Sequence, residues 1–226
     1  ASVLPLFETD NNLYPKTTGT VIIGEDIGGY KLQGVLNNIP ILEYYAASGI
    51  AVAHTDVDNL IRRLPLLMRT PDGWVASYGI EVLKVLLDAN SYIIKTNEYG
   101  LEEIIVQGLP PVSVDSLGRK WVSWVDTPQT TLEEMDVANK FVFVGFTAKG
   151  ISPQLATPTG LLEPHKIQAA LSESMLIQDS PQIPDYATAA ELLMLLASVV
   201  AVWVLINYLG ITLGVFLSTC ILILTS

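Results

Sequence analysis

The chain has 226 residues, a formal net charge of −11 and one cysteine, Cys220. The acidic balance excludes a nucleic-acid-binding domain, which needs a basic surface against the phosphates. The lone cysteine excludes an internal disulfide and a cysteine-based metal site, and the 50% hydrophobic content is ample for a core.

Short apolar runs between polar loops rich in Gly and Pro predict strands and one short helix in the first half of the chain. The helix is expected where Pro40 occupies the first turn and Gly49 follows the last. A Pro71-Asp72-Gly73 turn between apolar runs predicts a hairpin. The expected elements are strands at 3–7, 21–23 and 50–53, the helix at 40–48 and a hairpin of 64–69 with 74–76.

Further helices, a second hairpin and a buried strand are predicted next. Residues 77–87 have an apolar helical face, with Glu81 and Lys84 on the opposite face. Thr130 and Glu133 have the spacing of a capping box, which predicts a short helix. The wholly apolar run 141–144 predicts a strand that is buried on both faces. The other expected elements are strands 112–114 and 121–125 around a turn at 115–118, and a helix at 165–175.

The end of the chain is predicted to lie in a membrane. Residues 192–209 carry no charge, and roughly 20 apolar residues suffice to cross the hydrocarbon core. A buried helix pair in a soluble protein is the alternative. We therefore expect an α/β domain over 1–178, with a mixed sheet flanked by helices, and then a linker and all-α transmembrane helices over 179–226. One span is expected to be complete, at about 188–209, and one truncated, at about 211–226.

No motif predicts a cofactor, a metal ion or a catalytic group. A GxxxxG spacing at 145–150 is followed by Ile151, where a phosphate loop requires Lys. The Asp56-x-Asp58 start of a calcium loop is followed by Leu60 at a ligand position. The chain has no Gly-x-Ser-x-Gly nucleophile elbow either.

A ligand crevice is predicted where two loops leave the sheet. If strands 50–53 and 141–144 are neighbours, their exits bring the two loops together. Hydroxyls and cations would then converge, which suits a small polar or anionic ligand. The candidate ligand-binding residues are His54, Asp56, Asp58, Arg62, Thr147, Lys149, Thr157 and His165. The alternative is that Arg62 holds an aspartate and that the threonines stabilise their own turns.

Three blocks resemble a known family. The first is HTDVDNLIRRLPLL at 54–67, the second is FVFVGFTAKG at 141–150 with Thr157-Pro158 after it, and the third is Pro164-His165-x-x-Gln168-Ala169. In this order they resemble the second class of CHASE domains, the cyclase/histidine-kinase-associated sensory extracellular domains. Two positions depart from the family pattern. Asn59 stands where Gly is usual, and Pro153 stands where an acidic residue is expected.

The resemblance implies a bacterial receptor of the inner membrane, multi-pass, with its sensor on the extracytoplasmic side. The family's N-terminal anchor and first sheet elements are expected to be missing from this chain. A nucleotide cyclase, a histidine kinase or a Ser/Thr kinase would form the output, so the chain itself is expected not to be an enzyme. A membrane-tethered extracytoplasmic α/β enzyme and a structural or binding domain of an envelope complex are the alternatives.

The expected partners are a small ligand or a protein stimulus, the membrane, and a second copy of the chain. Gly210 and Gly214, with Thr212 and Ser218 nearby, form a small-residue pattern that permits close approach of two helices. The sequence therefore predicts a homodimer through the membrane segment. The alternative is that these residues pack within one protomer.

Overall fold

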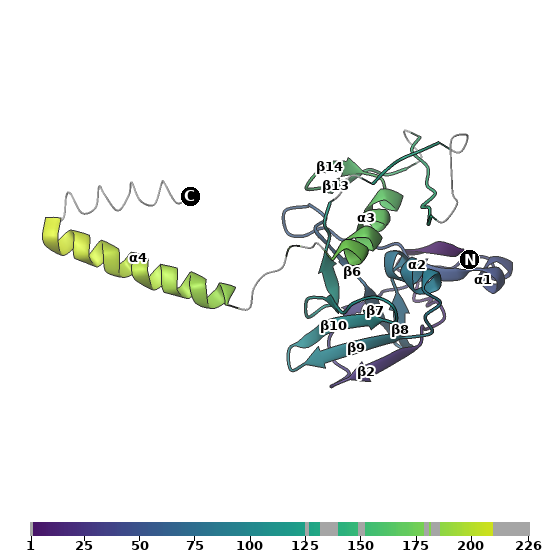
Figure 1. The fold of residues 1–226 in the computed structure, drawn as a ribbon, viewed down its shortest axis with the longest axis horizontal. Coiled ribbons are helices and arrows are strands. Elements are labelled where there is room, and N and C mark those ends of the chain that lie inside the picture. Colours follow the sequence, from purple (N-terminus) through teal and green to yellow (C-terminus); the bar gives the residue numbers. More distant parts are fainter. Residues whose placement is uncertain are drawn as a thin grey trace. The chain divides into compact units, whose positions relative to one another are not determined.

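The computed structural model describes residues 2–124, 127–131, 140–148, 152–178, 181 and 186–209. The chain divides into two compact units, Ala1–Pro181 and Gln182–Ser226. In the described part, the first unit contains α1 (Pro40–Tyr45), α2 (Tyr78–Leu86) and α3 (Pro164–Ile177), and the second contains α4 (Ala187–Leu209) (Figure 1). The predicted helices at 77–87 and 165–175 are confirmed as α2 and α3.

Fourteen short strands in the described residues form several small sheets instead of the single mixed sheet that was expected. One sheet has the order β4-β1-β5, with β1 (Val3–Glu8), β4 (Val35–Leu36) and β5 (Ala47–Ile50). A second has the order β11-β10-β9-β2, with β2 (Thr20–Ile23), β9 (Tyr92–Asn97), β10 (Gly100–Val106) and β11 (Val112–Ser113). A third has the order β3-β7-β8, with β3 (Tyr30–Lys31), β7 (Leu67–Thr70) and β8 (Gly73–Ala76). Two ribbons pair β12 (Arg119–Trp121) with β6 (Arg63–Pro65), and β13 (Leu155–Thr157) with β14 (Gly160–Leu162). Parallel and antiparallel pairs coexist, so the mixed α/β class is confirmed.

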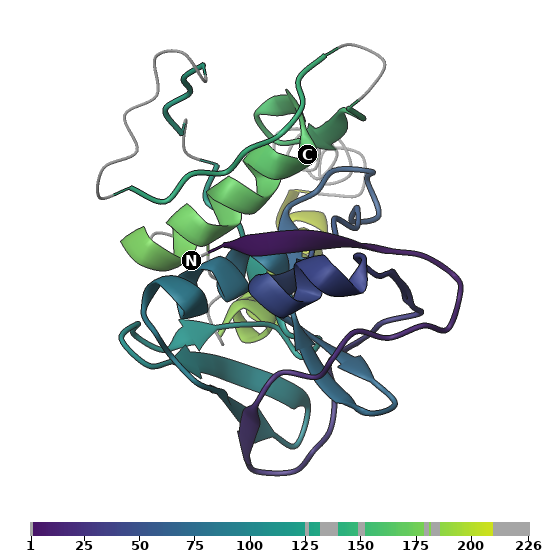
Figure 2. The ribbon, with the colours of Figure 1, turned by 90° about the vertical axis from the view of Figure 1, so that its right-hand side faces the viewer.

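The main core lies where α2 and α3 cross and cover strands of the first unit (Figure 2). Gly79 lies where α2 approaches α3 closely. Its N–H donates to Gln168 Oε1 at 3.1 Å, and its carbonyl accepts from Ser172 Oγ at 2.9 Å. The Gln168 amide also donates to the Val52 carbonyl at 3.1 Å. The buried side chains of this core include Ile80, Leu83, Ile94, Ile104, Ile167 and Leu171. A single buried amide therefore joins α3 to α2 and to the segment after β5.

The predicted strand at 141–144 is wrong. Residues 140–148 form no strand, and Phe141, Val142 and Val144 are 37%, 43% and 72% exposed. Phe143 packs edge-on against the Tyr78 ring, with the ring centroids 5.6 Å apart. An apolar run specifies only that burial is favourable, and a strand also needs a neighbouring strand to pair with.

The second predicted hairpin is also wrong. The turn exists, since Gly118 N–H donates to the Asp115 carbonyl at 2.7 Å. However, β11 pairs with β10 and β12 pairs with β6, so the two sides of the turn belong to different sheets. The first hairpin is confirmed as β7–β8.

Several element boundaries differ from the prediction. The helix at 40–48 ends at Tyr45, and the strand expected at 50–53 is β5, which ends at Ile50. Glu81 lies in the interior instead of on a solvated face, because it accepts from Tyr92 Oη at 2.6 Å and from Lys84 Nζ at 3.0 Å. Burial of Tyr92, together with the Glu81 charge, raises the Tyr92 pKa well above 10.0. The capping-box helix near Thr130 and the span at about 211–226 lie outside the described residues.

In the second unit, α4 begins at Ala187, close to the expected start of the first span. Its Ala187–Val204 window has a mean hydropathy of 2.1. Ser198 Oγ donates to the Leu195 carbonyl at 2.7 Å, and Asn207 Nδ2 donates to the Trp203 carbonyl at 2.8 Å. Each of these side chains thus donates one hydrogen bond to the backbone of its own helix, which lowers the cost of removing it from water. By length and composition α4 is able to cross a membrane.

Candidate functional site

The loop at 54–62 is a tight turn that presents charged side chains. Asn59 N–H donates to the Asp56 carbonyl at 3.0 Å, and Asp56 N–H donates to the Leu60 carbonyl at 2.9 Å. Asn59 has φ of 62°, the left-handed conformation that Gly adopts easily and Asn tolerates. The departure from the family's Gly at this position therefore leaves the turn intact.

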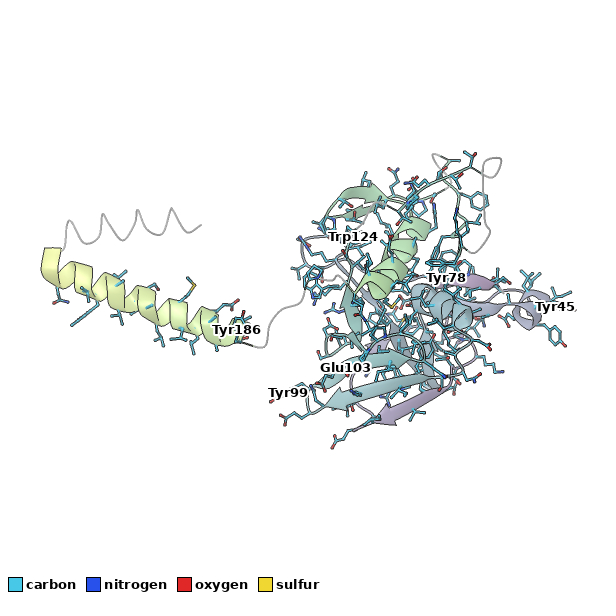
Figure 3. All side chains as sticks on the ribbon, in the orientation of Figure 1. Tyr45, Tyr78, Tyr99, Glu103, Trp124 and Tyr186 are labelled. Carbon is cyan, nitrogen blue, oxygen red and sulfur yellow. The ribbon has the colours of Figure 1, made fainter. Side chains whose placement is uncertain are left out.

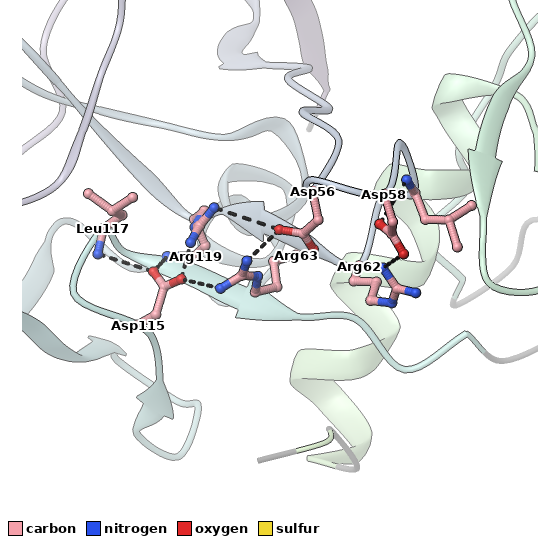
Figure 4. A network of polar contacts seen from close by, with 8 residues as sticks. Asp56, Asp58, Arg62, Arg63, Asp115, Leu117 and Arg119 are labelled. Carbon is pink, nitrogen blue, oxygen red and sulfur yellow. Dashed lines mark hydrogen bonds and ion pairs between the residues drawn. The ribbon is translucent and has the colours of Figure 1, made fainter. Parts of the chain in front are cut away.

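Two aspartates and two arginines form a closed network beside this loop (Figure 4). Arg63, on β6, forms an ion pair with Asp56 and donates to Asp115 Oδ2 at 3.2 Å. Arg119, on β12, donates from Nε to Asp115 Oδ2 at 2.8 Å and lies 3.9 Å from Asp56 Oδ1. The hydrogen bond from Arg63 to Asp56 raises the arginine pKa. The four charges cancel, so this network offers no net positive charge to an anion.

Strand pairing fixes the positions of the two arginines. In the antiparallel β12–β6 ribbon, Trp121 is opposite Arg63 and Arg119 is opposite Pro65. The Arg63 guanidinium also lies over the Trp121 ring, 5.2 Å from its centroid, which favours the charged group. The network therefore holds the 54–62 loop against the ribbon.

Arg62 and Asp58 form a separate pair closer to solvent. Arg62 Nη1 lies 2.5 Å from Asp58 Oδ2, with the side chains 32% and 43% exposed. The hydrogen bond from Arg62 lowers the Asp58 pKa. Arg62 was one of the predicted ligand cations, and the structure places it on a neighbouring aspartate, which was the alternative left open from the sequence.

Among the described residues, only the Thr157 end of the second predicted loop contacts the first loop, and the contact is not at the ends of two paired strands. Ile61 N–H donates to the Ala156 carbonyl at 2.9 Å, which joins the 54–62 loop to the β13–β14 hairpin. Thr157 is buried and its hydroxyl donates to the Gly160 carbonyl at 2.7 Å, inside its own turn. Asp56, Asp58, Arg62 and Thr157 thus lie on connected elements.

His54 belongs to a different cluster. Its Nε2 lies 2.7 Å from Glu8 Oε2 and 2.6 Å from Tyr30 Oη, and the Tyr30 and His54 rings are 4.8 Å apart. Burial, then the Glu8 charge and its hydrogen bond, raise the Tyr30 pKa to about 12. This cluster ties the segment after β5 to β1 and β3.

Three predicted ligand residues remain: Thr147, Lys149 and His165. None of them is shown to join the arginine–aspartate network or the His54 cluster. Thr147 is exposed in the 140–148 segment, and Lys149 lies outside the described residues. His165 is partly buried at the start of α3, and this desolvation lowers its pKa below 6.5. A Cβ at Gly145 would lie 2.1 Å from His165 Nδ1, so the glycine backbone packs directly on the imidazole.

Sequence reasoning missed Asp115 and Arg119 as site residues, named Gln168 only within the family motif, and noted Arg63 only beside Arg62 near the two aspartates. Arg119 follows Asp115 by four residues across the recognised turn, and that spacing was the available signal. Nothing local distinguishes Arg63 from Arg62. Across the described residues, no cluster of three or more His, Cys, Asp or Glu side chains could hold a metal ion.

Comparison with protein families supplies the identification. The CHASE2 domain family matches this chain over residues 6–209. The chain belongs to the CHASE2 domain family. CHASE2 domains are extracellular sensory modules of signalling receptors. No curated protein and no solved structure matches the chain.

Proposed function

We propose that this CHASE2 chain is the input part of a bacterial transmembrane receptor. The first unit senses on the extracytoplasmic side of the inner membrane, and the receptor passes through that membrane more than once. A nucleotide cyclase, a histidine kinase or a Ser/Thr kinase is the output. The observation that carries the proposal is the single family match, which runs through the α/β unit and on to Leu209, the last residue of the apolar helix α4.

The topology is tested by labelling Asp72→Cys in a Cys220→Ser background. Asp72 is exposed in the turn between β7 and β8. A membrane-impermeant maleimide is expected to label this variant in intact cells, after its outer membrane is made permeable where one is present, and to leave the Cys220→Ser parent unlabelled. Labelling that needs disruption of the inner membrane would put the first unit in the cytoplasm and contradict the proposal.

We further propose that the stimulus is a small polar or anionic ligand bound where the 54–62 loop meets the β13–β14 hairpin. The exposed Arg62–Asp58 pair supports this, because the guanidinium is able to exchange a surface carboxylate for a ligand at little cost. The partly buried Arg63 network supplies the rigid support. The proposal assigns no catalytic activity to this chain, in which Asp56 and Asp115 are both held by arginines.

Thermal-shift screening of the full chain with small anions tests the ligand proposal. A stabilising anion is expected to lose its effect in Arg62→Ala and keep it in Arg69→Ala. Arg69 is a matched control, because it pairs with Asp26 at 2.7 Å with 32% and 50% exposure. Equal loss in both variants would indicate nonspecific charge binding, and no stabilising anion would favour a protein stimulus instead.

A further inference from the structure

A cleft of about 590 Å³ lies in the first unit between the segment 15–19, α1 and α2. Small-molecule sites in proteins have volumes of this order. Its floor contains buried apolar side chains, which are Ile50 at the end of β5 and Val75 and Ala76 on β8. The floor therefore offers an apolar surface to a small ligand.

The helix α1 forms one wall of the cleft and packs loosely on the rest of the unit. None of its side chains is buried, and Tyr45, at its end, is 77% exposed and projects away from the strands (Figure 3). Protein interiors are otherwise closely packed. The space beside α1 is thus left open by the fold.

Lys84, on α2, supplies a positioned cation in the cleft. Its Nζ donates to Glu81 Oε1 at 3.0 Å and to Thr18 Oγ1 at 3.2 Å, and it lies 5.2 Å from the centroid of the Tyr92 ring. An ammonium group has three N–H donors, so one of them has no hydrogen-bond acceptor among the described residues. The Lys84 side chain is only 15% exposed. It would therefore lose little conformational freedom on binding a ligand oxygen.

Two exposed charges of opposite sign complete the lining. Lys16 lies on the segment 15–19 and Glu43 on α1. Within the described part of the chain, neither side chain has a hydrogen-bond or ion-pair partner. Together with Lys84 and Glu81 they give the cleft two positive and two negative charges. A ligand with one charge of each sign matches this balance better than an anion or a cation does.

We infer that this cleft binds a free α-amino acid with an apolar side chain. The ligand carboxylate accepts from Lys84 and Lys16, the ligand ammonium pairs with Glu43, and the side chain covers the floor at Ile50 and Val75. No residue of the 54–62 loop lines the cleft. It is therefore a second site, separate from the one proposed for a small polar or anionic ligand at that loop.

Thermal-shift screening of the full chain in detergent with the twenty standard L-amino acids is the first test. At saturation, at least one amino acid with an apolar side chain is expected to raise the melting temperature of the first unit by at least about 3 °C. Stabilisation by none of the twenty, or only by those with charged side chains, would overturn the inference.

Analogues of the stabilising amino acid test the two charge contacts. The same molecule without its amino group, and its primary amide without the carboxylate charge, are each expected to bind at least about tenfold more weakly. An analogue without the amino group that binds as tightly as the amino acid would contradict the role of Glu43.

Substitutions at the rim locate the ligand. Lys16→Gln and Glu43→Gln are each expected to weaken binding at least about tenfold. Their unliganded melting temperatures should stay unchanged, because both side chains are exposed and unpaired among the described residues. Lys31→Gln and Glu98→Gln remove exposed charges outside the cleft and should bind normally.

Arg62→Ala separates this site from the one proposed at the 54–62 loop. Amino-acid binding is expected to survive this substitution. Binding that is lost in Arg62→Ala but kept in Lys16→Gln and Glu43→Gln would place the ligand at the loop and overturn the cleft site. Equal weakening by Lys31→Gln and Glu98→Gln would indicate nonspecific charge effects and would also overturn it.

Discussion

At the scale of single residues, two neighbouring arginines have unequal roles. Arg63 has two aspartate partners and lies over Trp121, whereas Arg62 has one partner near solvent. An exposed ion pair contributes little to stability, while a partly buried charge left without its partner is costly. Stability should therefore depend on Arg63, and ligand binding on Arg62.

We predict that Arg63→Met lowers the free energy of unfolding by about 1–3 kcal/mol, because Asp56 and Asp115 would share the remaining Arg119. Arg62→Met is the matched control and should cost no more than about 0.5 kcal/mol. Urea unfolding of the first unit, followed by tryptophan fluorescence, measures both. Equal effects of the two substitutions would show that the network does not hold the loop.

His165 is expected to make the first unit sensitive to mild acid. Its folded-state pKa lies below the unfolded value of 6.5 because of desolvation. Between these two pKa values the unfolded chain binds more protons than the folded chain. The stability of the first unit is therefore full above pH 6.5 and falls as the pH drops through the folded pKa. Between pH 7 and pH 5, the melting temperature of His165→Gln should change less with pH than that of the unmodified chain. An unchanged pH profile would exclude this histidine as the cause.

At the scale of elements, the α2–α3 crossing requires a glycine. A Cβ at Gly79 would lie 3.0 Å from Leu171 Cδ2 and 3.2 Å from the Gln168 carbonyl oxygen. The side chain is able to move, whereas the backbone carbonyl is held in its helix. The crossing therefore cannot accept a methyl group without shifting one helix.

We predict that Gly79→Ala destabilises the first unit by about 1–3 kcal/mol through overpacking, although alanine has the better helix propensity. Leu86→Ala, at an exposed position of the same helix, is the control for propensity alone and should be nearly neutral. Thermal unfolding compares the two. A stabilised Gly79→Ala variant would mean that α2 and α3 are free to separate.

At the scale of the whole molecule, the homodimer remains a prediction from the sequence, because residues 210–226 lie outside the described part. If this run is helical, Gly210, Gly214 and Ile221 share one face, and Phe216 lies on the opposite face. Small residues on that face allow two helices to approach. Signal transfer across the membrane would then use relative motion of two copies.

Cysteine cross-linking in native membranes tests the dimer. Ile221→Cys in the Cys220→Ser background is expected to give a disulfide-linked dimer, and Phe216→Cys should give at least fivefold less. Monomer alone from both variants, across a range of expression levels, would count against a dimer through this helix. Similar yields from both would indicate random collision.

The sequence by itself determined the features that depend on a few neighbouring residues. The apolar helix α4, the turn of β7–β8 and the left-handed turn at Asn59 follow from hydropathy and local backbone preference. Similarly, α2 and α3 follow from helical periodicity. The family resemblance was also present in the sequence, because its motifs are local.

Only the tertiary structure decided which partner each group takes. Residues 141–144 look like a buried strand, but three of the four side chains are exposed, and the strands on either side of the turn at Asp115 join different sheets. Glu81 is interior because Tyr92 and Lys84 surround it, and Arg63, not Arg62, holds Asp56. Such choices depend on contacts between distant segments, where several partners of the same residue type compete and local sequence does not distinguish them.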